Sequence, residues 1–128
     1  MDTERLNAIS HQVIGAAMEV HRAMGAGLLE VVYAECLAME LGFRGLKVER
    51  EVPVPLVYKG CSVRHTFRLD LLVEGELVVE VKAVDELSSV HQAQLLTYLK
   101  LTGLRLGMLM NFNVAVMREG VKRVVNGL

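Results

Sequence analysis

Two carboxylates and a lysine, Asp70, Glu80 and Lys82, lie in otherwise apolar stretches of the chain at 69–73 and 77–84. Ionised side chains are rarely placed in such surroundings unless they are paired or bind a ligand. Two carboxylates, together with a backbone carbonyl such as that of Val81, offer only oxygen ligands, which suit Mg²⁺ or Mn²⁺ far better than zinc. A neighbouring ammonium group could stabilise charge that develops on a phosphoryl group. These residue types indicate metal-assisted phosphoryl chemistry.

Whether the two carboxylates meet depends on the register of a predicted β-hairpin. A two-residue turn at 74–75 pairs Asp70 with Val79, whereas a three-residue turn at 74–76 pairs Asp70 with Glu80. Gly75 suits the left-handed position of the longer turn. The longer turn also buries two apolar sets on one face, namely Phe67, Leu69 and Leu71 and, across from them, Leu77, Val79 and Val81. We therefore expect Asp70 to face Glu80, with a divalent cation relieving their repulsion.

The same charges also fit an ordinary solvated strand face. Asp, Glu and Lys are common, and their spacing often arises by chance. On this interpretation cations merely offset acids, the cations being Arg64, Arg68 and Lys82 and the acids Asp70, Glu74 and Glu80. The apolar character of 78–84 favours the metal site over this alternative.

Hydrophobic periodicity predicts the elements that position these residues. We expect helices over 3–24 and 28–41, and a third from Ser88 or Ser89 to Thr102. Asp2 or Thr3 would cap the first helix, and Gly42 and Gly103 would end the other two. We expect strands over 46–58, 61–73, 77–84, 106–110, 114–117 and 121–125. The order ααβββαβ, with an extra C-terminal hairpin, predicts a single α/β (α+β) domain over 1–128.

Some packing details follow from the same patterns. Pro53 and Pro55 cannot donate ladder hydrogen bonds, which places the first strand at an edge of the sheet or beside a bulge. The apolar strand at 106–110 should be covered on both faces. The second helix is expected to bury Leu29, Val32, Cys36 and Met39, and the core is expected to hold Cys61 as a reduced thiol together with the methionines Met18, Met24, Met108, Met110 and Met117.

Composition excludes several classes of protein. The chain has 128 residues and is 52% hydrophobic, but no apolar run reaches the roughly 20 residues that a membrane-spanning helix needs. The first residues lack the pattern of a secretory signal, so we expect a cytoplasmic protein. Neither a GxxxxGK[ST] phosphate loop nor a zinc-type Cys or His spacing occurs. The excess of apolar residues raises the hypothesis of a homodimer.

Charge is unevenly distributed along the chain. Residues 1–43 carry two cations and six carboxylates, and residues 44–128 carry twelve cations and nine carboxylates, within a net charge of −1. Nucleic-acid binding would therefore use a local patch and would be sensitive to salt. Aromatic residues make up only 5% of the chain and Trp is absent, which argues against a base-stacking platform for single strands.

The arrangement of these residues resembles a known family. Asp70 and Glu80-Val81-Lys82 on consecutive strands, followed by a helix with Gln94 and Tyr98, are similar to the PD-(D/E)XK nuclease superfamily, whose core order is αβββαβ. More narrowly, Gly27-Leu28-Leu29-Glu30-Val31-Val32-Tyr33 resembles the motif of the GxxExxY family, a set of small, mostly prokaryotic proteins in that superfamily. Ala26 stands where proline is frequent in the family, and Leu69 stands where the superfamily's name has proline, at a position that varies widely. Neither position carries a carboxylate.

The resemblance implies a restriction-endonuclease-like fold and a set of roles. Asp70 and Glu80 would hold Mg²⁺ (or Mn²⁺), and Glu30 would reach the metal directly or through water. Lys82 would lie near the scissile phosphate with Gln94 supporting it, and Arg68, Tyr33 and Tyr98 are candidates for substrate contact, as are the cations Lys59, Arg64 and Lys100. The implied activity is hydrolysis of DNA as an endo- or exodeoxyribonuclease. A surface charge at Glu30 and a core position for Tyr33 remain the alternatives for those two residues.

A second function also fits the sequence. The near-neutral charge, the small size and the lack of a separate DNA-recognition element favour a non-catalytic module that keeps the nuclease fold and binds nucleic acid or assembles with protein. An unknown protein partner could supply targeting in either case.

Overall fold

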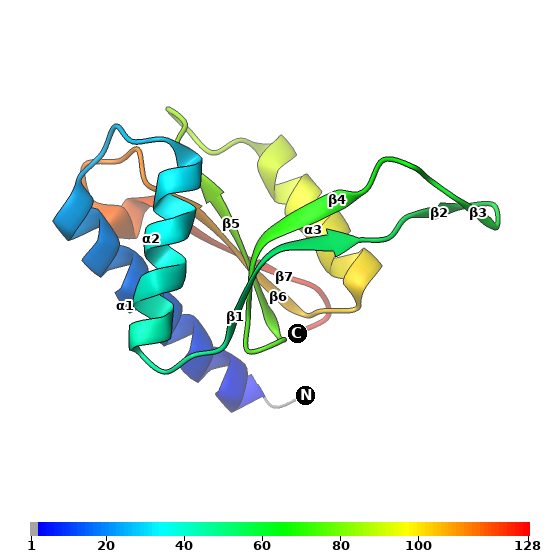
Figure 1. Cartoon of the computed structure of the whole chain (residues 1–128), viewed down its shortest axis with the longest axis horizontal. Coiled ribbons are helices and arrows are strands. Elements are labelled where there is room, and N and C mark those ends of the chain that lie inside the picture. Colours follow the sequence, from blue (N-terminus) through cyan, green and yellow to red (C-terminus); the bar gives the residue numbers. More distant parts are fainter. Residues whose placement is uncertain (1–2) are drawn as a thin grey trace.

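The segments with periodic apolar residues form the helices and strands of a computed structural model, which describes residues 3–128 (Figure 1). The helices are α1 (Thr3–Met24), α2 (Glu30–Phe43), α3 (Ser89–Thr102) and the short 3₁₀ helix η1 (Met117–Gly120). The strands are β1 (Val48–Val54), β2 (Val57–Tyr58), β3 (Cys61–Ser62), β4 (Phe67–Val73), β5 (Leu77–Lys82), β6 (Leu106–Asn111) and β7 (Val121–Val125). The predicted bounds of α1 are confirmed, whereas Asp2, one of its two expected caps, lies outside the described residues.

Five strands form a mixed sheet in the order β1-β4-β5-β6-β7. The strands β5 and β6 are parallel because α3 crosses between them, and the other neighbours are antiparallel. As expected from its prolines, β1 lies at an edge. As expected from its apolar sequence, β6 is buried along its whole length. The predicted restriction-endonuclease-like core is confirmed.

Each face of the sheet has its own hydrophobic core. The helices α1 and α2 lie together on one face, and α3 lies on the opposite face (Figure 1). The larger core joins residues of α1 and α2 to the sheet, among them Val13, Leu37, Leu71, Val79 and Met108. The smaller core joins α3 to the other face through Leu69, Val78, Leu95, Leu99 and Leu109. The sheet is therefore fixed from both sides.

The third helix begins and ends as its sequence predicts. Ser88 is the N-cap, and its side chain accepts a hydrogen bond from the His91 amide while the His91 ring accepts one from the Ser88 amide. Gly103 ends the helix in the left-handed conformation, with φ 73°.

The second helix differs from its prediction in both bounds and buried face. It extends to Phe43, so Gly42 lies inside it, and the left-handed glycine after the helix is Gly45, with φ 81°. The buried stripe consists of Tyr33, Leu37 and Leu41. The expected stripe of Leu29, Val32, Cys36 and Met39 is wrong: Leu29 and Met39 are exposed and the other two are half-buried. Because this helix carries apolar residues on several sides, spacing alone did not identify the face that the sheet covers.

The C-terminal segment also departs from its prediction. Residues 114–117 form no strand; Met117 begins η1, and β7 pairs with β6 instead of forming a separate hairpin. The approach of η1 to β6 is close, since a Cβ at Gly120 would lie 2.0 Å from the Asn111 carbonyl oxygen.

Several residues expected in the core are at the surface. Met18, Met24 and Met39 are 44–52% exposed, whereas Met108, Met110 and Met117 are buried. Cys61 is exposed on β3 and Cys36 is half-buried, and both are free thiols. Within residues 3–128, no helix has the length and apolar character needed to cross a bilayer.

Candidate active site

Asp70 lies opposite Glu80 in the register of β4 and β5. The pairs Leu71↔Val79, Leu72↔Val78 and Val73↔Leu77 lead directly to this position. The turn between the strands has positive φ at Glu74 (54°) and at Gly75 (68°). The expected three-residue turn, with Gly75 in the left-handed conformation, is therefore confirmed.

At this position the two carboxylates take the place of regular ladder bonds. The Asp70 amide donates to Oε2 of Glu80, and the Val81 amide donates to Oδ2 of Asp70, each over 2.8 Å. Each carboxylate is thus held by a backbone N–H of the neighbouring strand. The two acids are consequently fixed beside each other by adjoining strands, whose pairing is irregular here.

The opposite side of Asp70 is irregular as well. The strand β1 pairs with β4 at Arg50↔Leu71 and Val52↔Leu69, and Glu51 between these pairs has φ 51°. Such a conformation is uncommon for a residue other than glycine. The alternation of side chains changes at this point, because Leu71 packs against α1 and α2 whereas Leu69 packs against α3. The expectation that Phe67, Leu69 and Leu71 share one face is therefore wrong.

Burial raises the pKa of both acids. Glu80 is only 5% exposed, and burial, followed by repulsion from Asp70, raises its pKa to about 8. Burial also raises the pKa of Asp70, and the charges of Glu30 and Glu51 add to that effect. The charge of Lys82 lowers the pKa of both acids, so the ammonium group acts on the same site. The arrangement places two acids side by side at a position where a bound cation would favour their ionised forms.

The loop before α2 brings a third carboxylate toward the pair. Gly27 has φ 97°, and the Tyr33 hydroxyl donates to the Gly25 carbonyl (2.5 Å) and accepts from the Leu28 amide (3.1 Å). These contacts fix the start of the helix, where Glu30 is the first residue and accepts from the Ala83 amide over 3.2 Å. The spacing of glycine, glutamate and tyrosine thus places one acid at the end of β5.

Tyr33 itself belongs to the core. It is fully buried, and its ring stacks on Phe112 with 4.6 Å between centroids. It has no exposed surface to offer a substrate, which corrects the expectation of a substrate contact there. The alternative, a core position for Tyr33, is the one that the structure contains, and the hydrogen bonds of its hydroxyl fix the loop before Glu30.

Lys82 ends β5, and the backbone around it is fixed from β6. The Phe112 amide donates to the Lys82 carbonyl over 2.9 Å. The buried Asn111 side chain accepts from the Val84 amide (3.1 Å) and donates to the Val84 carbonyl (2.9 Å). The half-buried lysine therefore follows Glu80 on a short, well-anchored segment.

The helix α3 contributes one buried and one exposed side chain. Tyr98 is 6% exposed and contacts the ring of Phe67. Burial, together with the charges of Glu80 and Asp70, raises the pKa of its hydroxyl, so Tyr98 lies within electrostatic reach of the acids. Gln94 is exposed one turn before Tyr98. Arg68 is exposed on β4, two residues before Asp70.

A cavity of about 230 Å³ opens beside these acids, lined by Glu30, Val31, Ala34, Arg50, Glu51 and Asp70. Sequence analysis did not identify Arg50 and Glu51. The pairing of β1 with β4 places Glu51 across from Asp70. An edge strand with three consecutive charged residues, Glu49 to Glu51, next to a carboxylate-bearing strand is a pattern that could have revealed them.

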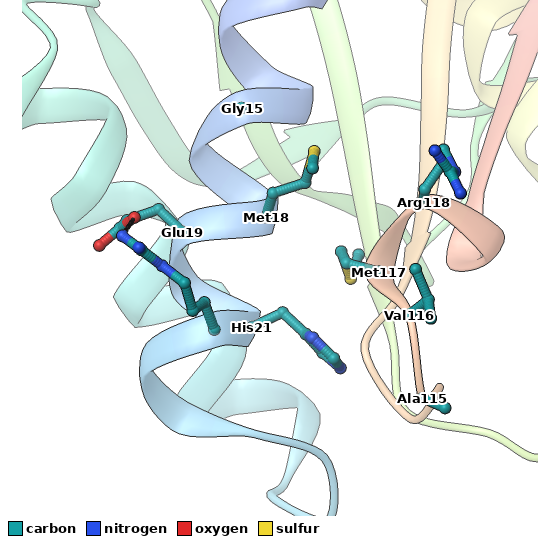
Figure 2. A pocket seen from close by; sticks show the side chains of 9 residues that line it. Gly15, Met18, Glu19, His21, Ala115, Val116, Met117 and Arg118 are labelled. Carbon is teal, nitrogen blue, oxygen red and sulfur yellow. Dashed lines mark hydrogen bonds and ion pairs between the residues drawn. The ribbon is translucent and has the colours of Figure 1, made fainter.

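A larger cavity, of about 520 Å³, lies elsewhere, between α1 and the segment that leads into η1. Figure 2 shows Met18, His21 and Met117 facing this space. The His21 ring is within 2.8 Å of the Val114 carbonyl and ties the two segments together. The cavity is mainly apolar and contains none of the paired acids, so the smaller cavity is the better candidate for chemistry.

The donor set is suitable for a hard divalent cation. Asp70 and Glu80 supply carboxylate oxygens at adjoining positions, and Glu30 and Glu51 add charge nearby. Across residues 3–128, however, no group of three or more His, Cys, Asp or Glu side chains is drawn together closely enough to hold a metal. Asp70 and Glu80 point instead at backbone amides, so binding would require small rotations of these side chains.

Comparison with known proteins gives a match to a family model. A model of the PD-(D/E)XK nuclease superfamily matches residues 7–124, which include all the elements described above except the first turn of α1 and the last residue of β7. No curated protein and no solved structure matches the chain significantly.

Proposed function

Because this chain belongs to the PD-(D/E)XK nuclease superfamily, we propose that it hydrolyses phosphodiester bonds in DNA with the help of Mg²⁺ or Mn²⁺. The observation that carries the proposal is the approach of Asp70 and Glu80, each held by an amide of the adjoining strand. We also propose that the chain belongs to the narrower GxxExxY family. The contacts through which Gly27, Glu30 and Tyr33 form one structural unit support this proposal.

The acids would form the metal site. Asp70 and Glu80 would turn their oxygens from the backbone amides to the cation, and Glu30, held at the Ala83 amide, would complete the site directly or through water. When bound, such a cation lowers the pKa of a water molecule and polarises the phosphoryl oxygen. Binding would also offset the burial and the repulsion from Asp70 that together raise the pKa of Glu80 to about 8.

The other residues would act on the substrate. Lys82, whose backbone is fixed by Phe112, would place its ammonium group against the phosphoryl oxygens and stabilise the charge that grows there. Gln94 and Arg68 are exposed and free to contact the DNA backbone, and Tyr98 would pack behind the acids.

A plasmid-cleavage assay tests this function. Supercoiled DNA incubated with the protein and Mg²⁺ or Mn²⁺ should be nicked or linearised, and EDTA should stop the reaction. Glu80→Gln, Asp70→Asn and Lys82→Met should each lower the rate by at least about 100-fold, because each removes a group that stabilises the transition state. Glu119→Gln, which changes an exposed acid on η1, is the matched control and should keep the wild-type rate.

Equal cleavage by the wild type and Glu80→Gln would assign the activity to a contaminant and contradict the proposal. Circular dichroism of each variant separates lost chemistry from lost fold. The linear or nicked products, compared on circular and end-labelled DNA, also distinguish endonuclease from exonuclease action.

One observation favours a second function. Asp70 and Glu80 are already satisfied by backbone amides, and no three-ligand group occurs among residues 3–128. A non-catalytic module that binds nucleic acid or a protein would need only this arrangement, in which the backbone amides occupy both carboxylates. Such a module would bind no divalent cation at these acids, and the metal experiment in the Discussion separates the two functions. The cytoplasmic location, the homodimer and a targeting partner remain hypotheses from the sequence.

A further inference from the structure

A two-stranded hairpin projects from the sheet beside the candidate site, and we propose that it is an arm that grips double-stranded DNA. The arm comprises residues 55–66 and contains β2 and β3. Figure 1 shows it extending away from the body of the protein, beyond the ends of β1 and β4. This inference rests on the proposed function, since it names the substrate of the same site.

The arm has a defined backbone. Val57 pairs with Ser62 and Tyr58 with Cys61, and the Val63 amide extends the ladder to the Leu56 carbonyl over 2.9 Å. The turn has positive φ at Lys59 (47°) and Gly60 (81°), as in the two-residue type I′ turns that match the twist of hairpins. Lys59 is therefore presented at the tip by an ordered ribbon.

A bulge joins the arm to the sheet. The register moves from Val54↔Phe67 in the sheet to Val57↔Ser62 in the arm, so residues 64–66 stand opposite Pro55 alone. Pro55 has no N–H to donate, and bulges bend a strand pair and turn it to a new direction. Arg64, His65 and Thr66 are all exposed at this bend. The bend thus presents a second cation, Arg64, between the tip and the site.

The arm gains little from packing. Every residue from Val57 to Ser62 is exposed, with Val57 at 61% and Tyr58 at 66%. An isolated two-stranded ribbon is at best marginally stable in water. A hydrogen-bonded ribbon that is surrounded by solvent and exposes apolar residues is better explained by contact with a ligand than by support of the core.

The charge of this region identifies the ligand as a polyanion. Residues 52–69 contain Lys59, Arg64 and Arg68 and no acidic residue, although the whole chain has a net charge of −1. The rest of the chain is therefore net negative, and the cations of this segment form the kind of local patch that nucleic-acid binding requires.

The shape of the arm favours duplex DNA over other nucleic acids. The major groove of B-form DNA, about 12 Å wide, admits a two-stranded β-ribbon, whereas the major groove of A-form RNA is too narrow for side chains to enter. Single-strand binding usually relies on aromatic side chains that stack on successive bases, and Tyr58 is the only Phe, Tyr or Trp among residues 55–66.

The arm is also correctly placed to act with the site. It continues the two strands that carry Glu51 and Asp70. The distance along the ribbon is counted on the strand without the bulge, where Pro55 stands opposite Arg64 and Glu51 lies across from Asp70. At about 3.3 Å per residue, Arg64 is then roughly 13 Å and Lys59 at the tip roughly 26 Å from the level of Asp70. With about 3.4 Å per base pair, the arm would contact phosphates about four to eight base pairs from the bond that is cut.

Salt-dependent binding tests this inference without any cleavage. Binding of a fluorescent 24-base-pair DNA duplex would be measured by anisotropy in EDTA at several salt concentrations. The double variant Lys59→Asn, Arg64→Gln removes both arm cations, and asparagine tolerates the left-handed backbone at the tip. Its slope of log affinity against log salt should be smaller by about 1.8, since each lost phosphate contact contributes about 0.9. The ratio of wild-type affinity to variant affinity for the duplex should therefore fall about tenfold between 50 and 200 mM salt.

The control variant removes two cations elsewhere. Arg118→Gln, Lys122→Gln changes exposed residues of η1 and β7, and β7 is the edge strand opposite β1. This variant should keep the wild-type slope. An RNA duplex and a single DNA strand of the same length should show a much smaller difference between the wild type and the arm variant.

Each outcome is informative. Equal slopes for the arm variant and the control variant overturn the inference, and so does an equal loss on all three nucleic acids, which would indicate general attraction of polyanions. If the arm variant loses duplex binding while the wild type cleaves no plasmid, the arm stands and the nuclease activity fails. If cleavage is present and the slopes are equal, the activity stands and the arm fails.

Discussion

Glu80 is buried beside another acid, and its titration should govern how stability responds to pH. Its usual pKa of 4.5 is raised to about 8 in the folded, metal-free protein. A raised pKa means that protonation favours the folded state, so this contribution is complete below about pH 4.5 and is lost as the pH rises to about 8.

The variant Glu80→Gln removes this pH dependence, because glutamine resembles the protonated acid at every pH. In EDTA we expect its melting temperature to exceed that of the wild type by several degrees at pH 8, with the difference closing toward pH 5. For a chain of this size, about 1 kcal/mol corresponds to roughly 3–6 °C. Thermal unfolding followed by circular dichroism at pH 5, 6, 7 and 8 measures the effect. A difference that is the same at pH 5 and pH 8 would contradict it, and Glu119→Gln should show none.

Residues around this pair show what spacing can and cannot predict. The turn at Gly75 and the facing of Asp70 and Glu80 followed from a register argument, of which only the burial of Leu71 with Leu77, Val79 and Val81 holds. The exchange of faces between Leu69 and Leu71 did not, since it depends on an interrupted ladder at Asp70 and on Glu51 of another strand.

At the scale of the elements, two glycines near the end of α2 have different conformations that the sequence alone does not reveal. Gly42 lies inside the helix with nothing within 4 Å of an added Cβ, whereas Gly45 has φ 81° after the helix end. Gly42→Ala should therefore stabilise the protein by up to about 1 kcal/mol, because alanine restricts the unfolded chain and has the higher helix propensity.

Gly45→Ala is the matched comparison and should destabilise by about 1 kcal/mol, since the left-handed conformation is strained for alanine. Urea unfolding of the two variants and the wild type measures both changes. Stabilisation by Gly45→Ala, or a loss of stability with Gly42→Ala, would show that α2 ends at Gly42 in solution.

The motif at the start of α2 is also a property of an element. The spacing of Gly27, Glu30 and Tyr33 indicated an acid near the site, but the sequence did not reveal how the three act together. The structure supplies the reason: Tyr33 is inserted between the loop and Phe112, and this anchors the helix start from which Glu30 reaches the end of β5.

For the whole molecule, metal binding should be linked to stability. Asp70 and Glu80 belong to two neighbouring central strands, so a cation that bridges them stabilises only the folded chain. At a metal concentration 100 times the dissociation constant, the free energy of unfolding rises by about 2.7 kcal/mol. We expect Mn²⁺ at pH 8 to raise the melting temperature of the wild type by several degrees.

The variants Asp70→Asn and Glu80→Gln should lose this rise, and Glu119→Gln should keep it. Calorimetric titration with Mn²⁺ gives an independent measurement of binding. If millimolar Mn²⁺ neither raises the melting temperature of the wild type nor releases heat in the titration, the result favours the non-catalytic module over the nuclease.

The sequence by itself determined the order of the three α-helices and of the strands of the central sheet, the placement of β1 at an edge or beside a bulge, the β4–β5 register and the facing of Asp70 and Glu80. These features follow from periodicity, from proline and glycine, and from burial of apolar side chains, all of which act over short distances along the chain. The tertiary structure alone decided which side of α2 is buried, that Tyr33 supports Glu30 from the core, that Glu51 lies across from Asp70, and that residues 55–66 stand apart as an arm. These features depend on contacts between segments distant in sequence, where packing and desolvation choose among local patterns that are equally acceptable.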